Sequence, residues 1–166
     1  MGITKERVSN QNGETHYRVL IRSFKDKMRN WNPGRLVKLK TINVDGVPLR
    51  LEIYPNGHNN SDDGCVSYYI ENLSDCDIEL DYELQLKKEI LERTECPIRA
   101  HSNYGHPRYF VHDEFLGNGR YDYDNDVNSD EAMEIQWIIK RVWKDVDSFN
   151  AINNNLSEQI QILTKI

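Results

Sequence analysis

The side chains best suited to hold a metal ion form an alternating acidic run in the last third of the chain. Its members are Asp122, Asp124, Asp126, Asn128 and Asp130. Calcium prefers such oxygen ligands, but an EF-hand loop needs glycine at its sixth position and a bidentate glutamate at its twelfth. Val127 and Met133 occupy those positions. The run therefore favours an acidic surface loop, and we predict no metal site.

Histidine and cysteine show no catalytic spacing. The histidines are His16, His58, His101, His106 and His112. None belongs to an HExxH pattern, and the sequence contains no phosphate loop, dinucleotide-binding turn or nucleophile elbow. We therefore assign no catalytic residue and no cofactor, and predict that the chain is not an enzyme. An enzyme built on such a chain would need a deep pocket with convergent titratable groups.

Charge and cysteine usage narrow the class of partner. The 166 residues carry a formal net charge of −6, whereas a nucleic-acid-binding surface is expected to be basic. No segment approaches the ~20 apolar residues that span a bilayer. Cys65, Cys76 and Cys96 have no CxxC spacing, and no signal-like apolar run opens the sequence. We predict no nucleic acid, no membrane, and a cytoplasmic or nuclear location.

Alternation of apolar and polar residues predicts an all-β chain. The clearest strand is 78–86, where Ile78, Leu80, Tyr82, Leu84 and Leu86 share one face. Further strands are predicted at 15–23, 36–43, 49–54, 66–70, 98–104, 109–116 and 133–142. Turn residues separate them, including a strong hairpin signal at Asp45-Gly46. Seven or eight strands at this spacing are typical of a β-sandwich or barrel.

One strand provides a candidate ligand contact. Val66, Tyr68 and Ile70 share the core face of the 66–70 strand, so Tyr69 points away from the core, beside Ser67. An outward tyrosine on a sheet is available to a ligand.

The two ends of the chain differ from this sheet region. Residues 1–13 are polar and are predicted to be a disordered segment, which leaves a sandwich at 14–146. Residues 147–166 are predicted to form a short helical connector. Its apolar residues fall at a spacing that resembles a heptad seam: Phe149, Ile152, Leu156, Leu163 and Ile166. This helix packs on the sandwich or leads into a following domain; self-association is the lesser alternative.

The same residues resemble a MATH (meprin and TRAF homology) domain over about 15–141. A strand ends in Tyr54-Pro55-Asn56-Gly57, and a polar loop leads to Val66-Ser67-Tyr68-Tyr69-Ile70. Downstream, Tyr104-Gly105 is similar to the family's aromatic-glycine pair, and Arg108-Tyr109-Phe110-Val111 to the strand that follows it. The acidic pair Asp130-Glu131 before the last strand also fits.

The resemblance implies an eight-stranded antiparallel TRAF-like β-sandwich that binds short extended peptides at a sheet edge. The implied groove residues are Tyr69, Tyr82, His101, Ser102, Asn103, Tyr104, Gly105 and His106. For Tyr82, a core position and a groove position stay open, because its phase places it with Leu80 and Leu84. For Tyr104 the alternative is a rim aromatic that covers the core, and for Gly105 a sheet bulge.

The resemblance also implies a biological role. Similar domains serve ubiquitin-ligase adaptors and ubiquitin-specific proteases, so we expect the partner-docking module of a ubiquitin-pathway protein, with short linear peptide motifs as partners. Oligomerisation through neighbouring segments stays open. The alternative function is a calcium- or carbohydrate-binding β-sandwich module, based on the acidic run and on exposed aromatic residues.

Overall fold

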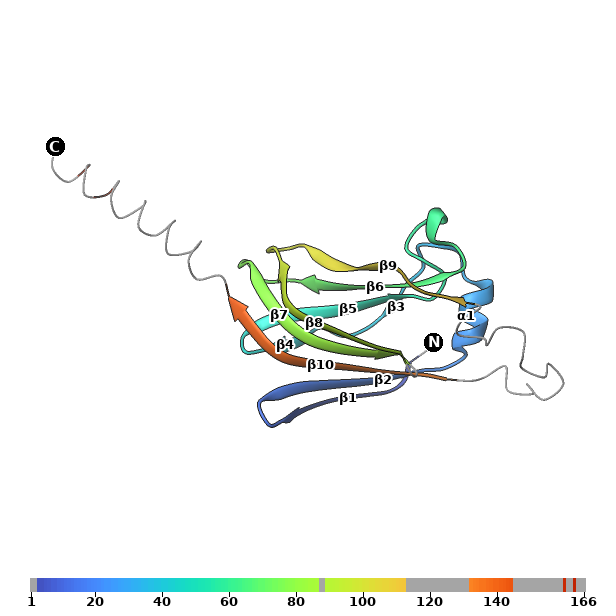
Figure 1. Ribbon diagram of the computed structural model, residues 1–166, viewed down its shortest axis with the longest axis horizontal. Helices are drawn as coiled ribbons and strands as arrows, with labels where there is room; N and C mark the ends of the chain where they lie inside the picture. Colours follow the sequence, from blue (N-terminus) through green and yellow to red (C-terminus); the bar gives the residue numbers. More distant parts are fainter. Residues whose placement is uncertain (1–2, 87–88, 113–131, 145–159, 161–162, 164–166) are drawn as a thin grey trace.

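A computed structural model describes residues 3–86, 89–112 and 132–144, together with Ile160 and Leu163. Most of these residues lie in strands, which form two antiparallel sheets packed face to face (Figure 1). The β-sandwich character that the alternation predicts is therefore confirmed. In the part of the chain that the structure describes, no helix combines the length and the apolar character needed to cross a membrane.

The first sheet has the strand order β1-β2-β10-β7-β8. Its strands are β1 (Ile3–Gln11), β2 (Glu14–Ile21), β10 (Met133–Lys144), β7 (Ile78–Leu86) and β8 (Glu89–Ile98). The second sheet follows the path β3-β5-β6-β9, with β4 also paired to β5. Its strands are β3 (Val37–Lys38), β4 (Ile42–Val44), β5 (Val47–Tyr54), β6 (Cys65–Asn72) and β9 (Asn103–Val111).

The inward faces of the two sheets form one apolar core. Trp137 of β10 lies in this core, edge-on to Tyr17 of β2 with ring centroids 6.5 Å apart. In β7 every second residue from Ile78 to Leu86 is buried, as its alternation predicts. Burial of each such aliphatic side chain stabilises the fold by about 1.5–3 kcal/mol. The core thus fixes the register of both sheets, because a one-residue slip would expose a whole face.

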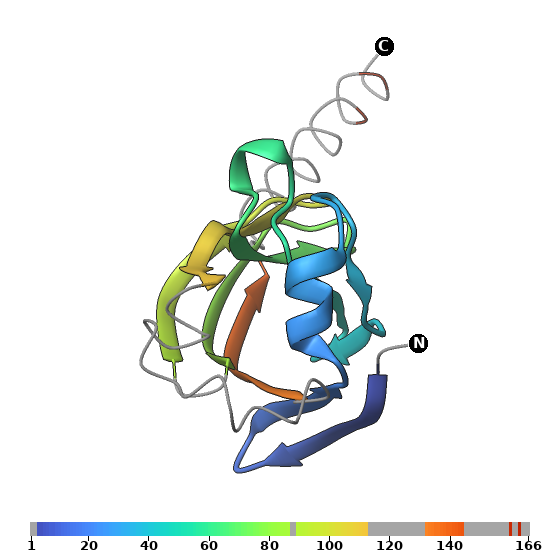
Figure 2. The same cartoon turned by 90° about the vertical axis from the view of Figure 1, so that its right-hand side faces the viewer.

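A short helix, α1 (Phe24–Asn30), covers one end of the sandwich (Figure 2). Phe24 and Met28 lie one helical turn apart, and both are buried. Lys27 is also buried, and its Nζ donates to the carbonyl of Arg22 at 2.6 Å. The pKa of Lys27 is lowered because burial penalises its charged form. Seven residues are too few for a clear 3.6-residue period in the sequence.

The N-terminal hairpin differs from the sequence prediction. Residues 1–13 were expected to be disordered, whereas β1 covers most of them and pairs along β2. Asn12 and Gly13 both have positive φ, the backbone of a two-residue hairpin turn. The hydroxyl of Tyr17 donates to Glu6 at 2.7 Å and links the two strands. The polar composition of β1 conceals the strand, and the Asn-Gly pair is the signal that reveals it.

The region around β8 and β9 also differs. Strands were predicted at 98–104 and 109–116, but β8 already ends at Ile98 and β9 runs from Asn103 to Val111. Pro97 lies within β8, which is an edge strand of its sheet and so tolerates proline. The described residues contain ten strands rather than eight, because β1 is added and the predicted strand 36–43 divides into β3 and β4.

Two predicted segments cannot be compared with the structure. The acidic run 122–130 lies outside the described residues. The helical connector 147–166 also lies outside them, except that Ile160 and Leu163 have helical backbone.

Candidate functional site

Four of the predicted groove residues lie together on β9. Asn103, Tyr104, Gly105 and His106 form the first half of this strand. On one side β9 pairs with β6, and no described strand pairs with its other side. An edge strand presents a row of backbone N–H and C=O groups to which an extended segment can add. The structure thus places these four residues on an edge strand.

His101 and Ser102 lie in the turn before β9 rather than in the strand. His101 is exposed and has a positive φ of 53°, and its Nε2 lies 2.6 Å from Asp75 Oδ1. Ser102 is also exposed, and its carbonyl accepts from the backbone N–H of Asn72 at 2.8 Å. The two residues flank the start of the edge without forming part of it.

A buried asparagine holds this turn in place. Asn72 is fully buried at the end of β6, and its Nδ2 donates to the carbonyls of Cys76, Ile98 and Arg99 at 2.8–3.2 Å. Its Oδ1 accepts from the N–H and the hydroxyl of Ser74. Through its side chain and its backbone N–H, Asn72 therefore ties the end of β8 and the turn before β9 to the end of β6.

Gly105 allows β9 to approach β6 closely. It lies opposite Tyr69 in the β6–β9 register. A Cβ atom at Gly105 would lie 1.9 Å from the carbonyl oxygen of Tyr68 and 2.7 Å from Cα of Tyr69. No side chain fits in that space without moving backbone, so glycine is required here. The backbone at Gly105 therefore lies against the backbone of Tyr68 and Tyr69.

A bulge follows in the second half of β9. Between the pairs Tyr68–His106 and Val66–Phe110, β6 advances by two residues and β9 by four. The hydroxyl of Ser67, which is fully buried, donates to the carbonyl of Pro107 and accepts from the N–H of His58. Ser67 was predicted to lie outward beside Tyr69 and does so, but the loop that contains His58 covers it. It supports the bulge instead of contacting solvent.

The rings of Tyr104, His106 and Tyr109 line the inward side of the edge and are called the aromatic wall. Tyr104 and His106 pair with inward residues of β6, Ile70 and Tyr68, and both are half-buried. Their rings meet edge-on with centroids 6.1 Å apart, and the His106 ring lies 5.6 Å from that of Tyr68. Tyr109 packs edge-on against Tyr68 at 5.1 Å. A segment on β9 would therefore direct alternate side chains at aromatic rings.

Tyr82 lies behind this wall, in the core. It is 1% exposed, and its hydroxyl lies 2.8 Å from that of Tyr68. Of the two positions that the sequence left open, the structure places it in the core. Burial is the main reason that the pKa of Tyr82 and that of Tyr68 are both raised, so both hydroxyls stay protonated at neutral pH. Tyr68 and Tyr82 thus fill the core directly behind the aromatic wall.

The outward side of the edge is more polar. Tyr69 is half-buried, and its ring contacts those of Tyr54 at 6.0 Å and His58 at 5.0 Å. Burial raises the pKa of Tyr69, and the nearby carboxylates of Asp62 and Glu52 raise it further. The pKa of Glu52 is also raised, mainly by burial and then by its hydrogen bond with Glu71. This side thus combines aromatic rings with acidic groups.

Sequence reasoning did not find two residues that complete the site, Asp62 and Arg93. Asp62 is buried, and its Oδ1 accepts from Arg108 Nε at 3.2 Å, which ties the loop before β6 to the β9 bulge. Arg93 of β8 reaches across to β9, and its Nη2 lies 2.9 Å from His106 Nε2. No local pattern signals either contact, because each joins residues on different strands. A register shift separates Arg93 from Cys96 in β8, so the alternation of the sequence does not place Arg93 inward.

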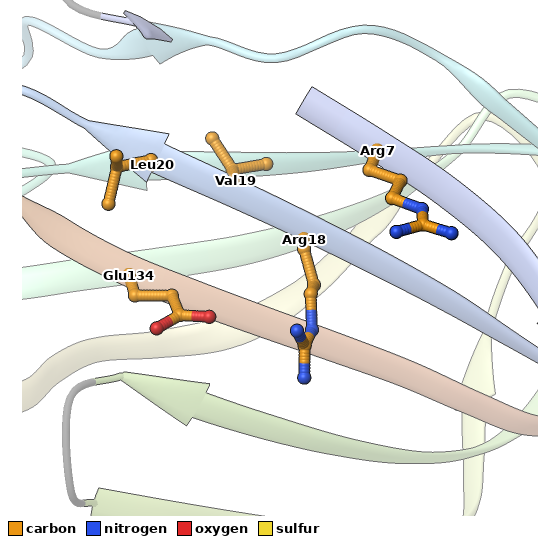
Figure 3. A pocket seen from close by; sticks show the side chains of 5 residues that line it. All are labelled: Arg7, Arg18, Val19, Leu20 and Glu134. Atoms are coloured by element: carbon orange, nitrogen blue, oxygen red, sulfur yellow. The ribbon is translucent and has the colours of Figure 1, made fainter. Parts of the chain in front are cut away.

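A pocket of about 300 Å³ lies at the opposite side of the first sheet. Figure 3 shows Arg7, Arg18 and Glu134 reaching into this region from β1, β2 and β10, with Val19 and Leu20 completing the lining. Arg7 and Arg18 face each other in the β1–β2 register, and all three charged side chains are exposed. The pocket is separate from β9. Its lining comes from β1, β2 and β10 of the first sheet, whereas β9 is an outer strand of the second sheet.

Potential metal ligands and thiols also occur among the described residues. Within them, no three His, Cys, Asp or Glu side chains are placed to hold a metal ion. None of the three cysteines forms a disulfide, and burial raises the pKa of the Cys96 thiol to about 11, so this thiol stays protonated. Neither a known protein-family model nor a curated protein sequence matches this chain.

Proposed function

We propose that this chain is a peptide-recognition domain that binds short extended segments as an added strand on β9. In this binding mode, backbone hydrogen bonds along a sheet edge supply affinity, and pockets for alternate side chains supply specificity. The observation that carries the proposal is the first half of β9. Its outer edge has no partner strand among the described residues, and aromatic side chains flank it on both faces.

The edge has a defined shape that suits an incoming strand. Asn72 holds the turn that leads into β9, and β9 lies close against β6 at Gly105. A preorganised edge loses little conformational freedom when a ligand binds, which favours affinity. Because a short added strand fills few side-chain pockets, we expect dissociation constants in the micromolar range, about −8 kcal/mol.

Each predicted residue has a place in this proposal. Asn103 to His106 present the backbone, Tyr104 and His106 receive inward side chains of the ligand, and Tyr69 receives outward ones. His101 and Ser102 contact the end of the ligand at the turn. The side chain of Tyr82 supports the wall from the core and does not touch the ligand.

The resemblance to MATH domains supports the wider role that we propose. In that role the chain is the substrate- or partner-docking module of a larger ubiquitin-pathway protein, either a ligase adaptor or a ubiquitin-specific protease. A cytoplasmic or nuclear location belongs to the same proposal, and three cysteines without a disulfide fit a reducing compartment.

Fluorescence-polarisation binding to a library of Ser/Thr-rich and Pro-containing peptides tests the proposal. We expect micromolar binding that is lost in a folded Tyr69→Ala, Tyr104→Ala double variant, because aromatic anchors dominate such interfaces. Val8→Ala is the control, since Val8 is 41% exposed on β1, away from the edge. Binding that survives in the double variant would contradict the assignment of the groove to β9.

A further inference from the structure

Arg93 places a positive charge between the two sheets. In the β7–β8 register it lies opposite Tyr82, a core residue, so its side chain also points inward. It is half-buried, and it reaches the inward wall of β9 at His106. A guanidinium in this position is unusual, because charged groups are rarely buried unless a partner neutralises them.

The contacts of Arg93 leave this cation poorly satisfied. Nη2 bonds to Nε2 of His106 at 2.9 Å. Since a guanidinium only donates hydrogen bonds, Nε2 must accept, and the imidazole is neutral with its proton on Nδ1. The Nε atom of Arg93 is buried and has no hydrogen-bond partner among the described residues. A buried donor without an acceptor costs about 1–3 kcal/mol.

No carboxylate of the described residues forms an ion pair with Arg93. Two arginines of the second sheet do have one: Arg50 pairs with Glu71 at 2.5 Å, and Arg108 pairs with Asp62 at 3.2 Å. Arg93 acts electrostatically on His106, Tyr68, Tyr82 and Cys96, and all four of these groups are neutral at pH 7. The inward wall of the edge therefore contains one cation without a counterion from the described residues.

We propose that Arg93 and His106 form a subsite for an acidic side chain of the segment that binds to β9. This inference rests on the proposed function. Alternate side chains of a strand added to β9 point between the sheets, on the side of Tyr104 and His106. A glutamate or aspartate carboxylate at this position pairs with the guanidinium of Arg93 and neutralises it. The flanking rings of Tyr104 and Tyr109 shield the ion pair from water, which strengthens it.

The test uses N-acetylated, C-amidated hexapeptide libraries in which one central position is fixed as Glu, Gln, Leu or Lys. Each library is titrated against the whole chain by fluorescence polarisation. We expect the Glu library to bind about tenfold more tightly than the Gln library, since a charge-assisted hydrogen bond is stronger than a neutral one. Arg93→Gln should reduce this ratio to about twofold or less. Arg99→Gln removes the same charge from an exposed position in the neighbouring turn, and should leave the ratio unchanged.

A second readout does not depend on any variant. The Nε–H resonance of Arg93, observed by nitrogen-15 NMR, should shift when the Glu library is added and should shift much less with the Gln library. Equal binding of the Glu, Gln and Leu libraries, with no shift at Arg93 Nε, would overturn the acidic subsite and leave the groove on β9 intact. Failure of every library to bind would instead overturn the proposed function and the subsite together.

Discussion

Gly105 of β9 lies directly opposite Tyr69 of β6, and the space between the two strands at this point excludes any side chain. We predict that Gly105→Ala destabilises the fold by about 1–3 kcal/mol, because its methyl group would overlap the carbonyl of Tyr68 and force the strands apart. Urea denaturation measures the change. Asn103→Ala, at an exposed position of the same strand, is the control and should change stability by less than about 0.5 kcal/mol. Equal midpoints for the two variants would show that the strands do not approach this closely.

The hydroxyls of Tyr68 and Tyr82 should be energetically coupled. They are fully buried and 2.8 Å apart. We predict that Tyr68→Phe or Tyr82→Phe alone costs about 1–2 kcal/mol, because each leaves one buried hydroxyl without its partner. The double variant should cost no more than either single one, since both polar groups are then removed. Additive losses in this double-mutant cycle, measured by chemical denaturation, would contradict the hydrogen bond.

Asn72 should be critical for the edge. Asn72→Ala removes the donor to three carbonyl groups, so we predict a loss of at least about 2 kcal/mol. In contrast, His101→Ala removes only an exposed contact with Asp75 and should cost less than about 0.5 kcal/mol. Thermal and urea unfolding of the two variants compare a buried anchor with a surface contact in the same turn. A small effect at Asn72 would mean that the turn is held by other contacts.

The stability of the fold should decrease as the pH falls through the range in which histidine titrates. The pKa of His106 is lowered, first by burial and then by Arg93. As the pH falls, the unfolded chain therefore takes up a proton at His106 near the ordinary value of 6.5, before the folded chain does. The contribution of His106 to stability is complete above this pH and is lost as the pH falls toward the lowered pKa of the folded state. Among the described residues, Arg93, Tyr68 and Tyr104 face His106, and none of these three is a carboxylate.

The measurement is the free energy of unfolding from pH 8 to pH 5 for the wild type and for His106→Gln. We predict that the variant loses less stability over this range. Glu52 has a raised pKa, so its contribution has the opposite sign: it is present at low pH and lost as the pH rises through the pKa of its folded state. Glu52 is present in both proteins, so the difference between the two profiles isolates His106. Parallel profiles would show that His106 is not held neutral by the fold.

The sequence predicts the central strands well and the edges poorly, for a physical reason. β7 alternates without interruption because both its neighbours are strands and one face lies in the core. Edge strands have weaker patterns. The inward position of Arg93 breaks the alternation of β8, and β1 is almost entirely polar. The predicted boundaries at 98–104 and 109–116 were therefore wrong, while the positions of Tyr69 and the core face of β6 were correct.

The candidate site was predicted in part. Local phase places Tyr69 outward, and the family resemblance selects Asn103 to His106, which the structure groups on one edge strand. The assignment of Tyr82 to the core requires its exposed fraction, which only the structure gives. The contact between Arg93 and His106 depends on the spacing between the two sheets, which the sequence does not contain. Residues that meet only through tertiary packing leave no local pattern, and this is why Arg93 and Asp62 were not found.

The most direct test of the central claim is amide hydrogen exchange of the whole chain, with and without the library peptide that binds most tightly. If a segment adds to β9 as a strand, alternate backbone amides between Asn103 and His106 should exchange more slowly in the complex. The amides of β1, the outer strand at the far side of the first sheet, should be unchanged. Protection on β1 or elsewhere, with no change on β9, would contradict the account.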